Sequence, residues 1–193
     1  MLRKARVVTP LAMIAMMLIL SACSSPPGPS APASPLPEGR TGIAELDAII
    51  AAVLEGGAAE LASLVDYTES KCTLAEGLGG PPKCLPGEQE GTVVEVLPFL
   101  GPEGSFIRKA DISTWQGIDV SDLHAVYEVS DAAYSDPDYP AGEYALVFTG
   151  GASGYGSVTL QVTGGRIVRI DYGLRAGPEI RSQDVVRYLV PPG

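Results

Sequence analysis

The chain has little of the chemistry from which enzyme motifs are built. His124 is its only histidine, and neither a G-x-S-x-G nor an H-E-x-x-H motif occurs among its 193 residues. A single histidine restricts nucleophile–base schemes, which need an imidazole beside a nucleophile. His124 is the one candidate general base because imidazole titrates near neutral pH, although a histidine on a strand is more often a surface residue with an ordinary hydrogen bond. We therefore favour a non-catalytic chain without a cofactor.

Basic residues are also scarce. Thirteen lysines and arginines stand against 23 aspartates and glutamates, so the formal net charge is −10. Nucleic-acid binding needs basic clusters that neutralise phosphates, and anionic lipid attracts basic rather than acidic surfaces. We therefore expect no nucleic-acid partner and no electrostatic docking on a membrane.

Two segments have the composition of ligand loops but lack the spacing. The segment 149–156, TGGASGYG, has no Lys-Ser/Thr pair and does not lead into a helix, which predicts a flexible strand connection rather than a phosphate loop. Asp131, Asp136, Asp138 and Glu143 bracket the stretch DPDYPAGE, and calcium prefers such oxygen ligands. Their spacing does not fit an EF-hand loop. An acidic turn interrupted by proline is the simpler interpretation, and we expect no metal site.

The N-terminal segment has the three-part build of an export signal. Arg3, Lys4 and Arg6 precede a mostly apolar run over residues 7–20, and small residues follow at 21 and 22. A basic start, an apolar middle and small residues before the cleavage site are typical of a signal peptide. The sequence therefore predicts export.

Residues 20–23, Leu-Ser-Ala-Cys, resemble the lipobox of bacterial lipoproteins. The resemblance implies that residues 1–22 are removed as a signal peptide and that Cys23, lipidated on its thiol, becomes the first residue. The formal charge then changes from −10 to −13, because three basic residues are lost. Two or more acyl chains hold a protein stably on a bilayer. We therefore expect the protein at the extracytoplasmic face of a cell membrane, either the plasma or the outer membrane.

Two other interpretations of this segment remain. An uncleaved transmembrane anchor would have 16 positions over residues 7–22, with Pro10 inside, whereas a bilayer core needs roughly 20 apolar residues. An ordinary secretory signal would make Cys23 incidental, which fits poorly with the small residues before it and the Ser/Pro-rich run after it.

Residues 23–40 comprise the lipidated cysteine and a linker. Positions 24–40 read SSPPGPSAPASPLPEGR, with six prolines and Leu36 as the only large apolar side chain. Such a segment buries too little surface to offset the entropy of ordering, so it is predicted to be disordered or extended polyproline. At about 3.1 Å per residue it reaches roughly 50 Å, which suits a spacer between bilayer and domain. A proline-rich ligand for a partner is the alternative.

Residues 41–193 are predicted to form a single globular α+β domain. A chain of this length buries about two-thirds of its unfolded surface. Apolar residues at three- and four-residue steps predict a first helix, which Thr41 or Gly42 can cap at its start and Gly56-Gly57 can end. A second short helix follows over residues 58–65. The helical apolar positions are Ile43, Leu46, Ile49, Ile50, Val53 and Leu54, then Ala58, Leu61, Leu64 and Val65.

The sequence from residue 92 onwards changes to strand patterns. Strands are predicted over 92–97, 123–129, 143–149, 156–163 and 166–172, with 185–190 either a strand or a short helix. Alternation would place Leu123, Ala125, Tyr127 and Val129 on one face of the second strand, opposite His124. Gly164-Gly165 predicts a tight hairpin. Helices followed by antiparallel strands indicate an α+β domain, a helix pair packed on a sheet.

Residues 46–65, LDAIIAAVLEGGAAELASLV, resemble the opening helices of nuclear-transport-factor-two-like domains, the superfamily of ketosteroid isomerase and polyketide cyclases. The resemblance implies an N-terminal helix pair on a curved antiparallel sheet, forming a cone that often holds a ligand. Asp111, Trp115 and Tyr127 are candidates to line such a cone. The chain departs from the family in its long cysteine-bearing loop and has no counterpart of the family's catalytic residues.

Cys72 and Cys84 remain once Cys23 is assigned to the lipid. Two cysteines 12 positions apart in an exported chain predict a disulfide. The segment between them, TLAEGLGGPPK, has no apolar period, so a bridge would hold an otherwise loose loop on the domain. A metal site is the alternative, but two cysteines and one distant histidine are an incomplete ligand set. A redox pair lacks the C-x-x-C spacing.

Three functional hypotheses follow from these features. The first is a membrane-anchored, non-catalytic lipoprotein that binds a small apolar ligand or another envelope protein. The second is an isomerase- or cyclase-like enzyme that transfers a proton inside the cone, with His124 or a buried carboxylate as base. The third is a structural or assembly subunit. An open apolar cavity with an inward-pointing acid or His124 would favour the enzyme, and a filled core with an exposed apolar patch would favour the partner-binding module.

Overall fold

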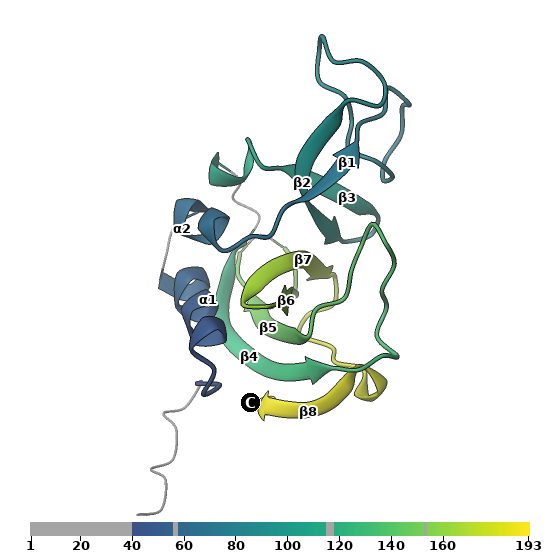
Figure 1. Cartoon of the computed structure of the whole chain (residues 1–193). Coiled ribbons are helices and arrows are strands. Elements are labelled where there is room, and N and C mark those ends of the chain that lie inside the picture. The colour runs from purple at the N-terminus through teal and green to yellow at the C-terminus, as the bar shows by residue number, and fades with distance from the viewer. Residues whose placement is uncertain (1–39, 56–57, 115–117, 153) are drawn as a thin grey trace, which may run out of the picture. The chain divides into compact units, whose positions relative to one another are not determined.

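The computed structural model describes residues 40–55, 58–114, 118–152 and 154–193. The predictions for the signal peptide, for Cys23 and for most of the linker concern residues outside these ranges. The described part combines a few helices with a single open, mostly antiparallel sheet of eight strands (Figure 1).

Two helices precede the strands in the chain. They are α1, Ala44–Glu55, and α2, Ala58–Ser63. The first helix begins at Ala44, three residues after Thr41, and Thr41 Oγ1 accepts a hydrogen bond from the N–H of Ile43 just before the helix at 3.0 Å. The Asp47 carboxylate reaches back to the Thr41 N–H at 2.8 Å. Together the two hydrogen bonds fix the residues before α1 to its first turn.

The sheet follows a simple order. Neighbouring strands run β1-β2-β7-β6-β5-β4-β8, with β3 paired on β2, and among the strands that the structure describes β2 and β7 are the one parallel pair. The last segment, ambiguous in the sequence, forms strand β8 on the edge beside β4. The strands are β1 Thr68–Lys71, β2 Val93–Leu100, β3 Gly104–Arg108, β4 Val120–Val129, β5 Tyr144–Gly150, β6 Ser157–Thr163, β7 Arg166–Gly173 and β8 Val185–Val190, with short 3-10 turns at Ile112–Thr114 and Ser182–Asp184.

The predicted hairpin joins β6 to β7 through two glycines. Thr163 and Arg166 are opposite one another, so Gly164 and Gly165 form the whole loop, with φ of 55° and 72°. Two consecutive residues with positive φ are typical of the primed turns that match strand twist. The hairpin prediction is therefore confirmed.

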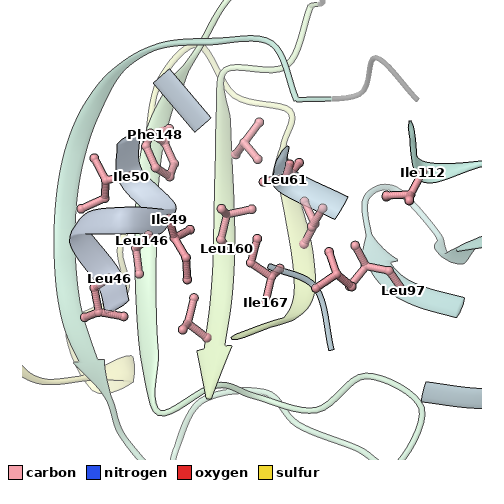
Figure 2. Packing of buried hydrophobic residues seen from close by; sticks show 14 of the residues in the cluster. Leu46, Ile49, Ile50, Leu61, Leu97, Ile112, Leu146, Phe148, Leu160 and Ile167 are labelled. Carbon is pink, nitrogen blue, oxygen red and sulfur yellow. The ribbon is translucent and has the colours of Figure 1, made fainter. Parts of the chain in front are cut away.

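The apolar face of α1 packs on the middle of the sheet. Figure 2 shows Leu46, Ile49 and Ile50 close to Leu146, Phe148, Leu160 and Ile167 of β5, β6 and β7. These side chains are between 0 and 8% exposed. At roughly 25 cal/mol per Å² of buried apolar surface, such a cluster is the main stabilising term of the fold. The helix-facing side of the strands is therefore filled with side chains.

The predicted alternation along β4 is wrong at Leu123. Between Leu123 and Ala125 the pairing with β5 shifts by one residue, which makes His124 the extra residue of a β-bulge. Leu123 packs on the helix-side cluster, whereas Ala125 and Tyr127 belong to a smaller cluster on the other face. A bulge changes the face on which the following side chains lie, so the period-two pattern does not continue through it.

Within the ranges that the structure describes, no helix has the length and apolar character needed to cross a membrane.

Candidate binding site

The loop between β4 and β5, residues 130–143, crosses to the β2–β3 hairpin and returns (Figure 1). We call these residues the strap. Near its far end the Tyr139 ring stacks on Phe106 of β3 with centroids 5.3 Å apart. Gly104 permits this approach, because a Cβ at that position would lie 2.4 Å from the Tyr139 hydroxyl oxygen. The strap is therefore packed against a strand distant from both of its ends in sequence.

Arg169 of β7 forms hydrogen bonds with the backbone of the strap. Its guanidinium donates to the carbonyl oxygens of Tyr139 at 2.7 Å and Tyr134 at 3.1 Å. The same group donates twice to Asp171, from Nε at 2.7 Å and from Nη2 at 3.0 Å. Arg169 is 3% exposed. A buried guanidinium with a bidentate carboxylate and two carbonyl acceptors satisfies the hydrogen-bonding demand that burial creates.

Gln161 of β6 completes this network. Its Nε2 donates to Asp171 Oδ2 at 3.0 Å, and its Oε1 accepts from the Gly142 N–H of the strap at 3.1 Å. Gly142 lies close to β6, where a Cβ would be 2.3 Å from the Val162 backbone nitrogen. Arg169 and Gln161 therefore fix the backbone of the strap at Tyr139 and Gly142 through polar contacts.

The strap forms one wall of a polar pocket of about 350 Å³, which we call the strap pocket. Because side chains alternate along a strand, its floor lies on the face of β6 opposite Val158, Leu160 and Val162, which belong to the helix-side cluster. The floor carries Ser157, Thr159, Gln161, Arg169 and Asp171, and the walls include Tyr127 of β4, Tyr134 of the strap, and Glu179, Arg181 and Asp184.

The charged groups of the lining are mostly paired with one another. Arg169 pairs with Asp171, and Arg181 Nε lies 2.8 Å from Asp184 Oδ2. The second oxygen, Asp184 Oδ1, is buried and has no hydrogen-bond partner among the described residues. A buried acceptor without a donor costs about 1–3 kcal/mol, so the Asp184 carboxylate, which lines the pocket, has hydrogen-bonding capacity that the fold leaves unused.

Tyr127 keeps its proton at physiological pH. Burial raises the pKa of its phenol to about 12, and the carboxylates of Asp184 and Asp171 act in the same direction. The ring packs edge-on against Tyr188 of β8 with centroids 6.0 Å apart. Tyr127 lines the pocket, and its phenol is there as a neutral hydrogen-bond donor and acceptor.

The structure does not gather the residues predicted to line a cone. Tyr127 lines the strap pocket, but Asp111 is exposed in the turn before Ile112–Thr114 and is not part of the lining. Trp115 lies outside the described residues. His124 sits at the β4 bulge, also away from the lining, and its imidazole makes no hydrogen bond or ion pair with any residue that the structure describes.

The acidic residues of the strap do not assemble a cation site. Asp136 accepts hydrogen bonds from the Tyr134 hydroxyl and from the N–H groups of Asp138 and Tyr139, which is the behaviour of an aspartate stabilising a turn. Asp131 and Glu143 line a second, open hollow of about 630 Å³ at the base of the strap. No three carboxylates of the strap come together there, among the residues whose placement is described.

Cys72 and Cys84 lie together at disulfide distance, with sulfurs 2.02 Å apart and Cα atoms 4.9 Å apart. They form, with Glu88, the one potential metal-ligating group found in the described ranges. The ligand atoms of this group are engaged in other interactions, because the sulfurs bond each other and Glu88 pairs with Arg108 at 2.7 Å. The hydrogen bond from Arg108 lowers the pKa of Glu88 to about 2. These contacts fix the loop rather than offer a site.

Sequence reasoning missed most of the strap pocket. A signal for its floor exists, because polar Ser157, Thr159 and Gln161 occupy alternate positions of β6, and Arg169 and Asp171 do so on β7. Polar side chains on one face of two adjacent, otherwise apolar strands indicate a polar surface. The segment that contributes Arg181 and Asp184 carries no comparable signal.

Comparisons with protein-family models, with curated proteins and with solved structures found no match for the chain.

Proposed function

We propose that the chain is an exported, membrane-tethered, non-catalytic binding module whose ligand occupies the strap pocket. The observation that carries the binding half is the buried network of Arg169, Asp171 and Gln161, which holds the strap over a polar floor. Pre-organised polar groups around a concave site are typical of small-molecule recognition. The tethering half rests on the lipobox-like residues 20–23 and on the proline-rich linker.

The fold that we propose is the nuclear-transport-factor-two-like arrangement, a helix pair ahead of a curved antiparallel sheet. It is supported by the order of elements, in which α1 and α2 precede the strands. The proposed ligand site nevertheless differs from the family's cone. The helix side is filled by residues such as Ile49 and Phe148, both 0% exposed, so the ligand is placed on the opposite face.

The side chains of the lining also indicate the polarity of the proposed ligand. An apolar ligand was the first expectation, yet the floor of the strap pocket consists of hydroxyl, amide and charged side chains. Burying those groups against an apolar molecule would leave them without hydrogen bonds. A polar ligand is therefore the better proposal. Of the two bases that the enzymatic alternative allows, His124 lies away from the lining, whereas the carboxylates of Asp171 and Asp184 lie in it and are paired with Arg169 and Arg181.

Tethering is tested by replacing the predicted lipid attachment residue. We expect Cys23→Ser to move the protein from the membrane fraction to the soluble fraction, and mass spectrometry of the native chain to show acyl chains on Cys23. Cys84→Ser is the matched control, because it removes a cysteine that bonds Cys72 instead. A native chain with an intact leader or an unmodified Cys23 thiol would overturn the tethering half.

Binding is tested with a mixed screen of charged and neutral polar small molecules. We expect at least one to bind saturably and to raise the unfolding temperature of the chain, as a ligand of the native state must. The absence of any binding at millimolar concentrations would contradict the binding half.

A further inference from the structure

We propose that the strap pocket binds a neutral, polyhydroxylated ligand of the saccharide class, and that Asp184 accepts a hydrogen bond from one of its hydroxyl groups. This inference rests on the proposed binding function and names the ligand class. It depends on charge compensation, on unused hydrogen-bonding groups and on an exposed aromatic ring.

The first argument is that each charged side chain of the lining is paired with an opposite charge. Arg169 pairs with Asp171 at 2.7 Å, and Arg181 pairs with Asp184 at 2.8 Å. Glu179 pairs at 3.1 Å with Arg175, which lies outside the lining. A charged ligand would enter without an uncompensated partner among these side chains and would lose its hydration shell. A neutral ligand does not carry that cost.

The second argument is the set of hydrogen-bonding groups that the fold leaves unused. The hydroxyls of Ser157, Thr159 and Tyr127 line the pocket and make no side-chain hydrogen bond with another described residue. Each hydroxyl both donates and accepts, whereas Asp184 Oδ1 only accepts. Sugar hydroxyls both donate and accept, so they match this mixture. Ammonium groups would leave the donating capacity of the hydroxyls unmatched, and phosphates would offer no donor to the Asp184 carboxylate in the lining.

The third argument is the aromatic surface beside these groups. Tyr134 lines the pocket, has the Arg169 guanidinium 5.8 Å from its ring centroid and is 49% exposed. The C–H-rich face of a sugar ring can pack on such a ring while its hydroxyls reach polar neighbours. The volume of about 350 Å³ lies at the lower end of small-molecule sites, which suits one or two sugar rings.

The test measures binding to the full chain in a detergent without a sugar headgroup. Calorimetry and saturation-transfer NMR are run with glucose, galactose, mannose, arabinose, N-acetylglucosamine and trehalose. The charged probes are phosphate, citrate, lysine and spermidine. We expect at least one neutral sugar to bind saturably and the charged probes to bind at least tenfold more weakly.

Variants locate the site. Asp184→Asn exchanges an ionised acceptor for an amide of equal size and is expected to weaken sugar binding about tenfold, since hydrogen bonds to charged groups are strong. Thr159→Val removes a pocket hydroxyl without disturbing an ion pair. It therefore tests the same site even if Asp184→Asn does not fold. Asp138→Asn is the control, because Asp138 belongs to the strap but not to the pocket lining.

The outcomes separate the two proposals. Charged probes that bind while sugars do not, with the binding weakened by Thr159→Val, would overturn the saccharide assignment and leave the binding module standing. Binding of no probe would overturn both. Sugar binding that is equal in the folded Asp184→Asn, Thr159→Val and Asp138→Asn chains would place the site elsewhere and contradict the inference.

Discussion

Removal of the Arg169 guanidinium should destabilise the chain far more than removal of an equivalent exposed one. In Arg169→Met, Asp171 would lose the pair at 2.7 Å and the carbonyls of Tyr134 and Tyr139 would lose their donor. Breaking a buried pair by deleting one partner costs about 3–5 kcal/mol. The Asp171 side chain is 26% exposed, so water would hydrate the unpaired carboxylate and offset part of the lost interaction energy. We therefore expect a decrease of about 3 kcal/mol in the free energy of unfolding.

The chain contains a matched control for this change. Arg187 Nε also lies 2.7 Å from a carboxylate oxygen, that of Glu128, but the Arg187 side chain is 63% exposed against 4% for Arg169. Exposed pairs contribute about 0–1 kcal/mol, so Arg187→Met should cost no more than that. Urea unfolding followed by far-ultraviolet circular dichroism compares the two variants. Equal losses would refute the argument that burial makes the Arg169 network important.

A double variant tests the reason for the loss. Arg169→Met combined with Asp171→Leu removes both charges, and replacing a whole buried pair by apolar residues is often nearly neutral. We expect the double variant to recover part of the stability lost in Arg169→Met. A double variant less stable than the single one would show that the carboxylate has a role beyond its partner.

Two further predictions concern the cysteine-bearing loop. The hydrogen bond from Arg108 lowers the pKa of Glu88 from 4.5 to about 2 in the folded chain. Between pH 4.5 and pH 2 the unfolded chain therefore binds a proton at Glu88 that the folded chain does not bind. The stability that this hydrogen bond contributes is lost as the pH falls through this range. The difference in unfolding temperature between the parent and Glu88→Gln should therefore shrink from pH 4.5 to pH 2, and a constant difference would contradict the assignment. Cys72→Ala with Cys84→Ala should lower the free energy of unfolding by about 3 kcal/mol, the chain-entropy value for a loop of this size, and a loss below about 1 kcal/mol would mean that the loop is held by its other contacts.

The helices and most of the strands were predictable because their patterns are local, whereas the short strands β1 and β3 were not predicted. Leu46, Ile49 and Ile50 recur at helical steps, and Gly164-Gly165 permits a turn that few other dipeptides do. The disulfide partners Cys72 and Cys84 needed only an even count once Cys23 was set aside. In each case the determining information lies within about a dozen residues, so no knowledge of the tertiary structure was required.

The strap pocket was not predictable in the same way, because distant segments make it. Arg169 binds the carbonyls of Tyr134 and Tyr139, which lie 35 and 30 residues earlier in the chain. Backbone carbonyls carry no sequence signal. Asp184 reaches the pocket from the connection before β8, and nothing in its neighbours indicates a binding residue.

Two β-bulges explain why alternation also failed as a guide to the faces. One lies at His124 on β4, and the other at Val168 on β7, where Gln161 pairs with Arg169 but Val162 pairs with Ile167. A strict period of two would put Ile167 and Arg169 on the same face. The bulge instead places Ile167 in the helix-side core and Arg169 in the polar network.

The β6–β7 hairpin therefore places residues both in the helix-side core and in the strap pocket. Its two-glycine turn sets the register, and its bulge sends Ile167 towards α1 while Arg169 turns to the strap. A slip of one residue would exchange the two faces, burying the Arg169 guanidinium against Ile49 and Leu46 with no acceptor. Because an unpaired buried charge costs several kcal/mol, the Arg169 network penalises wrong registers as well as holding the strap. The same interactions that shape the proposed site therefore also select the native pairing of the sheet.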